Sequence, residues 1–193
     1  MRIIGGQFKG KKILEPKDKK TRPLKDMVRE SIFNIIIHSN KFSINLKDSK
    51  ILDLFCGVGS FGLEAISRGA NFVLFVENYL SVIEILKKNI NDLKLNQKCK
   101  IINEDILNKI DFNKFDQEFD LIYLDPPFKE KKITLLLDKI NQSNILNKNS
   151  MIILHRHTSE KDIFPNFVNI LEQKNYGNSK IFFMNFLKFI RTN

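Results

Sequence analysis

The sequence contains little cysteine and no long apolar run, and each absence restricts what the protein can be. Its two cysteines, Cys56 and Cys99, stand in unrelated contexts, so they provide neither a disulfide framework nor a metal-ligand spacing. No apolar run approaches the roughly 18 residues that cross a bilayer. The first residues, MRIIGGQFKGKK, lack the long apolar stretch of a signal peptide. We therefore expect a cytoplasmic protein without a membrane partner.

Length, composition and charge indicate a globular chain with a basic surface. The 193 residues are enough for one ordinary domain, and a hydrophobic content of 42% excludes a disordered or fibrous protein. The formal net charge of +10 is typical of proteins that bind nucleic acid. Because the chain is rich in Lys, Asn and Ile, the base composition of its gene could also produce this charge. The distribution of the charge is therefore more informative than its total.

The positive charge is densest at the N-terminus. Residues 1–22 hold eight basic side chains against two acids, Glu15 and Asp18. Glycines lie between the basic residues, which predicts a loop or short hairpin that presents the charge to phosphate groups. The candidate contacts with nucleic acid are Arg2, Lys9, Lys11 and Lys12.

Strand and helix patterns alternate along the rest of the chain. A first helix is expected to begin at Pro23, where the missing N–H costs nothing. Alternating strands and helices predict an α/β fold with a parallel sheet covered on both faces. The expected strands are 51–55, 72–76, 100–102, 119–124, 150–154, 170–176 and 180–186. The expected helices after the first are 61–68, 80–95, 106–110 and 133–140, and residues 160–171 are expected to be helical or irregular.

Acids and glycines follow the ends of several predicted strands. Ligands of such sheets bind beyond the carboxyl ends of the strands, at the point where the strand order reverses. The fold therefore brings four features of the sequence to one edge. These are residues 53–59, Glu77, Asp105 and Asp125.

Residues 53–62, DLFCGVGSFG, form a glycine loop between a predicted strand and a predicted helix. Its G-x-G-x-x-G spacing, with Glu77 twenty residues after Gly57, is typical of dinucleotide binding. However, Asp53 at the strand end would repel a pyrophosphate and attract a cation. S-adenosyl-L-methionine carries a sulfonium and an ammonium and no phosphate, so we favour it over a nicotinamide or flavin cofactor. Cys56 is interpreted as a small filler, because no histidine near it in sequence could activate the thiol.

Each residue around the glycine loop has an expected role. Gly57 and Gly59 would allow the cofactor's methionine portion to approach the backbone closely, and Gly62 would let the helix pack against the strand. Glu77 is expected to bind the ribose. Asp105 would accept a hydrogen bond from the adenine amine, beside the Ile106 backbone, or would cap a helix, and the sequence supports both equally.

The stretch LIYLDPPFKE, residues 121–130, ends a predicted strand with an acid, two prolines and an aromatic ring. An exocyclic base amine is a poor nucleophile because its lone pair is delocalised. The Asp125 carboxylate and the Pro126 carbonyl could hold its two N–H groups, while the prolines fix the backbone beforehand. Phe128 offers a face on which the base can stack. The bland alternative is a strand terminator without a function.

With these motifs, the chain resembles the bacterial 16S ribosomal RNA guanine-N2 methyltransferases of the RsmD type. The resemblance rests on MRIIGGQFKGKK, on RPLKDMVRESIFNII (22–36), on LDLFCGVGSFGLEAISRGA (52–70), on LIYLDPPF, and on a late Tyr176-Gly177 turn. It implies a class I S-adenosylmethionine-dependent fold, Rossmann-like, with a seven-stranded sheet whose last strand is antiparallel and a short N-terminal β-hairpin extension. It also implies methylation of a guanine N2 amine in 16S ribosomal RNA, in the small subunit or its assembly intermediate, by a monomer.

The resemblance also assigns residues. It implies a basic RNA-binding extension over residues 1–22 and a methyltransferase domain over 23–193. The catalytic loop would be Asp125, Pro126, Pro127 and Phe128. Cofactor contacts would be Arg22, Pro23, Asp53, Phe55, Gly57, Gly59, Glu77, Asn78, Asp105 and Ile106, with Arg22 and Pro23, together with Thr21, near the methionine end. No metal ligand is expected.

One segment departs from the family. Such proteins often carry an acid after the fifth strand, where this chain has Leu154-His155-Arg156-His157. Two histidines at i, i+2 without a third ligand argue against a metal pair and favour surface residues near RNA, or simply a strand end.

Other functions stay open from sequence alone. An adenine-N6 methyltransferase acting on DNA or RNA would use the same DPPF loop. A nicotinamide-dependent oxidoreductase would use the glycine loop. A non-catalytic RNA-binding assembly factor is disfavoured because Asp53, Glu77 and Asp125 are all present.

Overall fold

The computed structural model describes residues 1–16, 26–39, 41–42 and 44–187. The predicted start of the first helix at Pro23 and the predicted contacts Thr21 and Arg22 lie outside these residues. The helices are α1 (Asp26–His38), α2 (Ser60–Ser67), α3 (Leu80–Asp92) and α4 (Ile133–Asn141), with short 3-10 turns η1 (Gly6–Phe8) and η2 (Phe112–Lys114). The strands are β1 (Lys50–Leu54), β2 (Phe72–Glu77), β3 (Cys99–Asn103), β4 (Phe119–Leu124), β5 (Leu146–His157), β6 (Val168–Tyr176) and β7 (Ser179–Phe186).

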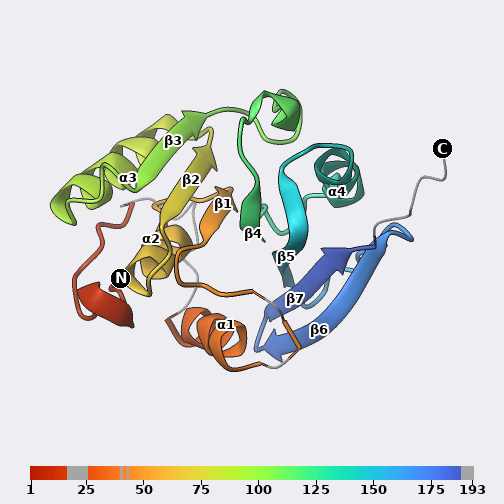
Figure 1. The fold of residues 1–193 in the computed structure, drawn as a ribbon, viewed down its shortest axis with the longest axis horizontal. Coiled ribbons are helices and arrows are strands. Elements are labelled where there is room, and N and C mark those ends of the chain that lie inside the picture. Colours follow the sequence, from red (N-terminus) through yellow and green to blue (C-terminus); the bar gives the residue numbers. More distant parts are fainter. Residues whose placement is uncertain (17–25, 40, 43, 188–193) are drawn as a thin grey trace.

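One seven-stranded sheet organises the molecule, in the order β3-β2-β1-β4-β5-β7-β6 (Figure 1). Strands β1 to β5 pair in parallel, and β7 runs antiparallel to both β5 and β6. The strand order reverses between β1 and β4, which are neighbours. The glycine loop follows β1 and the DPPF loop follows β4, so both motifs stand at the point where such sheets bind their ligands. The expected fold, with its antiparallel last strand, is confirmed.

Alternation of side chains along the strands divides the core into two layers. In β1, Ile51 joins a layer packed against α1, α2, α3 and the N-terminal segment. Leu52 and Leu54 point to the opposite face and join a layer formed by α4 and the 106–112 segment. Asp53 therefore points toward α2, on the same face as Ile51.

Glycine determines how closely α2 approaches the sheet. A Cβ at Gly62 would lie only 2.4 Å from Cε1 of Phe75 in β2. Only glycine allows this approach, as the sequence predicted. The β6–β7 hairpin also depends on glycine, because Gly177 has a φ of +57°.

Two element predictions differ from the structure. Residues 106–110 form a single turn and no helix: the N–H groups of Lys109 and Ile110 both donate to the Asp105 carbonyl, and the Asp105 carboxylate caps the start of the turn by accepting from the Leu107 and Asn108 N–H groups. Residues 160–167 are irregular, one of the two forms expected for 160–171, and β6 begins at Val168, before its predicted start at residue 170. Strand β5 is longer than residues 150–154. The sequence did not indicate that the strand continues to His157, because His155 and Arg156 are polar. In the structure both side chains are buried and bonded to partners described below.

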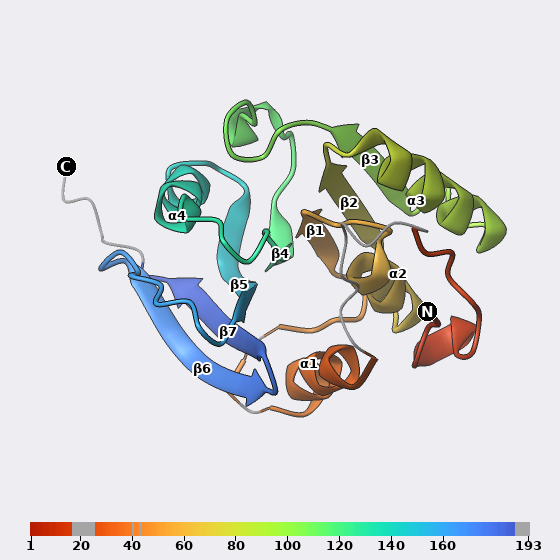
Figure 2. The same cartoon turned by 180° about the vertical axis from the view of Figure 1, so that it is seen from behind.

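The N-terminal segment forms the predicted short hairpin, with one bridge between Arg2 and Lys12. It packs beside α2 and α3 in both views of the fold (Figures 1 and 2). Ile3 and Ile13 are buried in the layer that contains α1 and α2. In the described part of the chain, no helix has both the length and the apolar character needed to cross a bilayer.

Candidate active site

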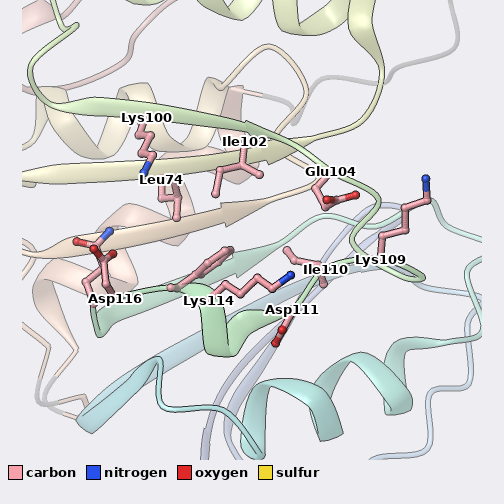
Figure 3. Close-up of a pocket in the computed structure, with 11 residues that line it drawn as sticks. Leu74, Lys100, Ile102, Glu104, Lys109, Ile110, Asp111, Lys114 and Asp116 are labelled. Carbon is pink, nitrogen blue, oxygen red and sulfur yellow. The ribbon is translucent and has the colours of Figure 1, made fainter.

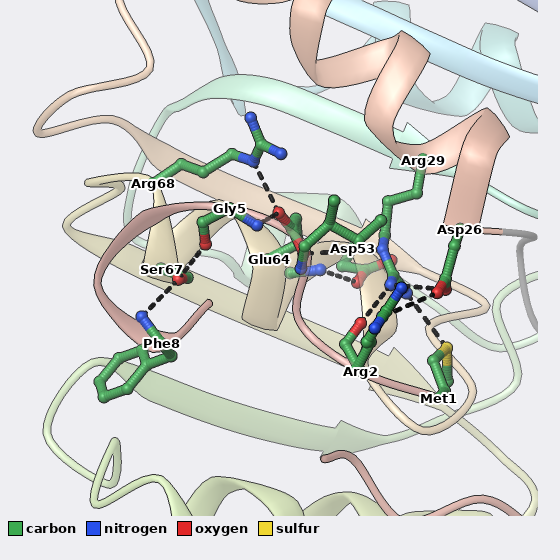
Figure 4. A network of polar contacts seen from close by, with 12 residues as sticks. Met1, Arg2, Gly5, Phe8, Asp26, Arg29, Asp53, Glu64, Ser67 and Arg68 are labelled. Carbon is green, nitrogen blue, oxygen red and sulfur yellow. Dashed lines mark hydrogen bonds and ion pairs between the residues drawn. The ribbon is translucent and has the colours of Figure 1, made fainter. Parts of the chain in front are cut away.

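Asp53 lies at the carboxyl end of β1 and is completely buried. Its Oδ2 accepts a hydrogen bond from the Gly62 N–H at 3.0 Å (Figure 4). Its Oδ1 is buried and has no hydrogen-bond partner among the described residues. Burial raises the pKa of Asp53 well above its ordinary value, and the nearby carboxylates of Asp125 and Glu77 raise it further, against the Gly62 hydrogen bond. An unpaired buried carboxylate oxygen of this kind fits the ammonium group of S-adenosylmethionine.

The glycine loop has an open side and a packed side. Phe55, Gly57 and Gly59 all have left-handed backbone, with φ values of +58°, +55° and +83°. A Cβ at Gly57 would meet nothing within 4 Å, whereas a Cβ at Gly59 would lie 2.4 Å from Cδ1 of Leu86. The left-handed backbone of Gly59 and its close contact with Leu86 of α3 therefore both favour glycine at this position. Gly57 faces open space that a cofactor could fill, and both cofactor roles remain predictions.

Glu77 joins the end of β2 to the glycine loop. Its Oε2 accepts from the Gly57 N–H at 3.0 Å. Its Oε1 accepts from the N–H groups of Asn78 and Tyr79, at 2.8 and 3.0 Å. A carboxylate has about four acceptor positions, so the fixed side chain can still accept from a ribose hydroxyl.

Asp105 supports the capping interpretation more directly than the adenine one. Its Oδ1 accepts from Leu107 N–H and Asn108 N–H, and its Oδ2 accepts from the Asn108 amide. The hydrogen bonds from Asn108 lower the pKa of Asp105. Ile106 is buried beside it. The adenine contact stays a prediction for both residues.

The DPPF loop begins where β4 ends. The Asp125 N–H donates to the Leu54 carbonyl at 3.3 Å, which continues the β1–β4 pairing and places Asp125 beside the glycine loop. Pro126 is buried, Pro127 is exposed, and the Pro127 carbonyl closes a turn by accepting from Glu130 N–H at 2.9 Å. The Asp125 side chain is 23% exposed. The loop therefore has a fixed backbone and an accessible carboxylate.

An aromatic stack supports Asp125 from within the sheet. Tyr123 pairs with Asp53 in the β1–β4 register, and its ring stacks on Phe61 with centroids 3.8 Å apart. Phe61 stacks in turn on Phe33 of α1 at 4.9 Å. Burial raises the pKa of the Tyr123 phenol, and the carboxylates of Asp125 and Asp53 add to this effect. Because the pKa is raised, the phenol stays neutral in this acidic environment.

Sequence reasoning missed the residues that hold the DPPF loop. His155 is 5% exposed, so its interpretation as a surface residue is wrong, although β5 does end nearby at His157. His155 Nδ1 lies 2.8 Å from Asp125 Oδ1, and Arg156 donates to the carbonyls of Pro127 and Glu130 at 3.3 and 2.8 Å. The register of the structure explains the contact: Leu154 pairs with Leu124, so His155 lies beside Asp125, and no local sequence pattern gives this register.

Phe128 packs against the same β5 segment. Its ring lies edge-on to His155, with centroids 5.6 Å apart, and is tilted against His157 at 5.2 Å. The ring is partly exposed. The side chains of this segment therefore contact both the acid and the aromatic ring of the loop.

The predicted RNA contacts Arg2, Lys9, Lys11 and Lys12 are all exposed. The segment that carries them is held by buried polar side chains on the helices. The Glu64 carboxylate accepts from the N–H groups of Ile4 and Gly5, both at 2.8 Å (Figure 4). The basic surface is thus fixed to the fold.

Further buried groups complete this anchor. Ser67 Oγ accepts from Phe8 N–H at 2.9 Å and donates to the Gly5 carbonyl. Arg29 donates to the Arg2 carbonyl and to Asp26. Burial lowers the pKa of the Arg29 guanidinium, against the opposing effect of the Glu64 and Asp26 carboxylates.

A cavity of about 240 Å³ lies apart from these motifs, between β3 and the 104–117 segment (Figure 3). Leu74, Ile102 and Ile110 provide apolar walls, and Lys100, Lys109 and Lys114 alternate with acids around it. None of the predicted site residues lines it.

Comparisons with known proteins show the family of the chain. The family described as conserved hypothetical protein 95 matches residues 1–185. The ribosomal RNA small subunit methyltransferase D of Haemophilus influenzae is 31% identical over 178 residues, which cover 92% of this chain and 89% of that protein. These matches favour methyl transfer over the nicotinamide alternative.

Solved structures share the whole fold. A structure from Escherichia coli described as a methyltransferase, yhhF, has a TM-score of 0.80 and 25% identity, and the match covers 95% of this chain and 96% of that one. A methylase from Haemophilus influenzae, HI0767, has a TM-score of 0.75 and 29% identity, covering 97% and 98%. The chain therefore belongs to the family of the ribosomal RNA small subunit methyltransferases D, with the class I fold of S-adenosylmethionine-dependent methyltransferases.

Proposed function

We propose that the protein methylates ribosomal RNA with S-adenosyl-L-methionine, and specifically the exocyclic N2 amine of a guanine in 16S RNA during small-subunit assembly. The name of the Haemophilus relative supports the ribosomal substrate. The observation that carries the proposal is the position of Asp125, beside the glycine loop at the reversal of strand order. The guanine N2 amine follows from the family resemblance of the sequence.

The proposed cofactor contacts are of two kinds: acidic side chains that accept hydrogen bonds, and an open stretch of backbone at Gly57. Bound S-adenosylmethionine supplies an activated methyl group. Asp53 Oδ1 would accept from its ammonium, Glu77 would accept from its ribose, and the open side of Gly57 would admit its methionine portion. Asp53, Glu77 and Asp125 place three acidic side chains close together at this edge of the sheet, which suits a cationic ligand. Phe55, Gly59, Asn78, Asp105 and Ile106 complete the proposed contacts, with Arg22 and Pro23 outside the described residues.

The DPPF loop would prepare the base amine. The Asp125 carboxylate and the Pro126 carbonyl accept its two N–H groups, which favours a pyramidal nitrogen with an available lone pair. Among the described residues, no hydrogen bond reaches the Pro126 carbonyl, so this acceptor is free for the substrate. Phe128 stacks on the base. The proton leaves to water after the transfer, and Asp125 acts chiefly by orientation.

The basic N-terminal segment would contact the RNA backbone. Arg2, Lys9, Lys11 and Lys12 are exposed on a segment that is fixed to the fold. Charge contacts with phosphate release counterions, so RNA affinity should fall steeply as salt rises. Joint replacement of Lys9, Lys11 and Lys12 by Ala should make that salt dependence shallower.

Mass-spectrometric mapping of modified nucleosides in small-subunit RNA, with and without the gene, tests the proposal. A missing N2-methylguanosine in the deletion strain, restored by the gene, is the expected result. Methyl transfer in vitro to free RNA, small-subunit particles and duplex DNA separates it from the adenine-N6 alternative. A methylated adenine as the product would contradict the choice of base and leave methyl transfer intact.

A further inference from the structure

A chain of hydrogen bonds runs from Asp125 into the antiparallel part of the sheet. Asp125 Oδ1 lies 2.8 Å from His155 Nδ1, and His155 Nε2 lies 2.9 Å from Ser179 Oγ. The three residues come from the end of β4, from β5 and from the start of β7. The imidazole side chain is only 6% exposed, so water competes little for either ring nitrogen.

The chemistry of these groups fixes the direction of the hydrogen bonds. An ionised carboxylate only accepts, so Nδ1 of His155 must carry a proton and donate to Asp125. In the neutral ring Nε2 then accepts, and the Ser179 hydroxyl can donate to it. Ser179 thereby favours the tautomer that Asp125 requires.

Orientation of the Asp125 carboxylate is what the proposed reaction needs. The torsion that rotates a carboxylate has a broad, shallow preference, so without a partner this group would sample many directions. Catalysis by a positioned acceptor requires that the direction be set before the substrate arrives. His155 Nδ1 lies at hydrogen-bond distance from the Asp125 carboxylate, and the buried Tyr123 phenol also interacts with this carboxylate from β4.

We propose that His155 is a positioning residue for Asp125, an inference that rests on the proposed function. Its Nδ1–H holds one carboxylate oxygen and leaves the other for the base amine, while Ser179 sets the tautomer.

The same imidazole also packs against Phe128, so a test must separate hydrogen bonding from ring packing. Two substitutions do this. His155→Phe keeps a ring beside Phe128 and removes both hydrogen bonds. His155→Asn removes the ring and keeps an N–H donor close to the position of Nδ1.

The first experiment reads the tautomer directly and needs no activity. The chain has three histidines, so a long-range proton–nitrogen NMR spectrum of the intact protein can be assigned with single His→Asn variants. A proton on Nδ1 of His155 supports the proposal, and Ser179→Ala should weaken that preference. An imidazole protonated at Nε2 alone overturns it.

The second experiment measures turnover on small-subunit particles. His155→Phe should lower kcat by about tenfold to a hundredfold, with KM for S-adenosylmethionine and thermal midpoint close to those of the native protein. His155→Asn should recover most of kcat, and Ser179→Ala should lose less than His155→Phe. His38→Asn, at an exposed position on α1, is the matched control.

The outcomes separate this inference from the proposed function. A loss of less than threefold for His155→Phe, in a protein that methylates its RNA normally, overturns the positioning role alone. If the native protein methylates no ribosomal RNA, the proposed function fails while the NMR result still decides the tautomer. If His155→Phe does not fold, the NMR spectrum of the native protein and the turnover of His155→Asn and Ser179→Ala still test the positioning role.

Discussion

The two loops of the proposed site are held in different ways. The glycine loop is fixed mainly by backbone N–H groups that donate to Asp53 and Glu77, two acids of the neighbouring strands. The DPPF loop is fixed by side chains of β5, where His155 contacts Asp125 and Arg156 bonds to Pro127 and Glu130. The first kind of support depends on a local sequence motif. The second depends on which strands become neighbours.

Replacing Asp125 by Ala should have the largest effect on the reaction. If its carboxylate orients the amine, turnover falls by about 10² to 10³, while binding of S-adenosylmethionine changes little because Asp53 and Glu77 remain. Single-turnover methylation of small-subunit particles and calorimetric cofactor binding measure the two effects. Normal turnover with intact cofactor binding would refute the role of Asp125.

Arg156→Met should show how much the DPPF loop depends on β5. The guanidinium is buried, and it also bonds Asp162 at 2.9 Å, so its loss leaves a buried carboxylate unpaired. Removing one member of a buried pair costs about 3 kcal/mol. Denaturant unfolding measures this, with Lys148→Met at an exposed position of the same strand as the control. An unchanged denaturation midpoint for Arg156→Met would show that the DPPF loop does not depend on Arg156 for its stability.

Asp53→Asn should separate stability from cofactor binding at the glycine loop. Loss of a charged hydrogen bond would weaken S-adenosylmethionine binding about tenfold to a hundredfold. The raised pKa of Asp53 means that the folded protein releases this proton at higher pH than the unfolded chain does. Its contribution to stability therefore falls as pH rises through the folded pKa.

The cofactor-free Asn variant should accordingly gain stability relative to the native protein as pH rises from acid to neutral. Thermal unfolding across that range measures the gain. Equal pH profiles for the two proteins would mean that Asp53 is not strained by burial.

The smallest effects should distinguish the two sides of the glycine loop. Gly62→Ala places a methyl group against Phe75 and should cost about 1–3 kcal/mol of stability, with cofactor affinity unchanged in the folded fraction. Gly57→Ala meets no neighbour and should cost about 1 kcal/mol through its left-handed backbone, but should weaken cofactor binding. Chemical unfolding measures the stability of the two variants, and calorimetry measures their affinity for S-adenosylmethionine. Equal losses of affinity in the two variants would contradict the distinction between a packed side and an open side of the loop.

The sequence predicted the elements that follow local patterns. The alternating strands and helices, the role of Gly62 and the carboxyl-edge location of Asp53, Glu77 and Asp125 all follow from spacing and residue type. The prediction of a helix over residues 106–110 was wrong: the apolar residues there fit a helix, but the structure has a single turn, in which the Lys109 and Ile110 N–H groups both donate to the Asp105 carbonyl.

What the sequence hid are buried polar groups whose partners are distant along the chain. His155 lies 30 residues from Asp125, and Glu64 lies 60 residues from Ile4. His155 was predicted to be a surface residue because a polar side chain is buried only where a partner satisfies it. Only the strand register and the docking of the N-terminal segment reveal these partners.

Gly6 has a consequence for how the molecule meets a large substrate. A Cβ there would lie 1.8 Å from the Ser67 carbonyl oxygen, so the backbone of the N-terminal segment sits directly on the end of α2. Sliding or swinging away would break that contact along with those made by Glu64. The exposed lysines of the N-terminal segment are therefore held in a fixed position relative to the sheet, so an RNA bound to them, as proposed, would approach the strand ends in a defined orientation.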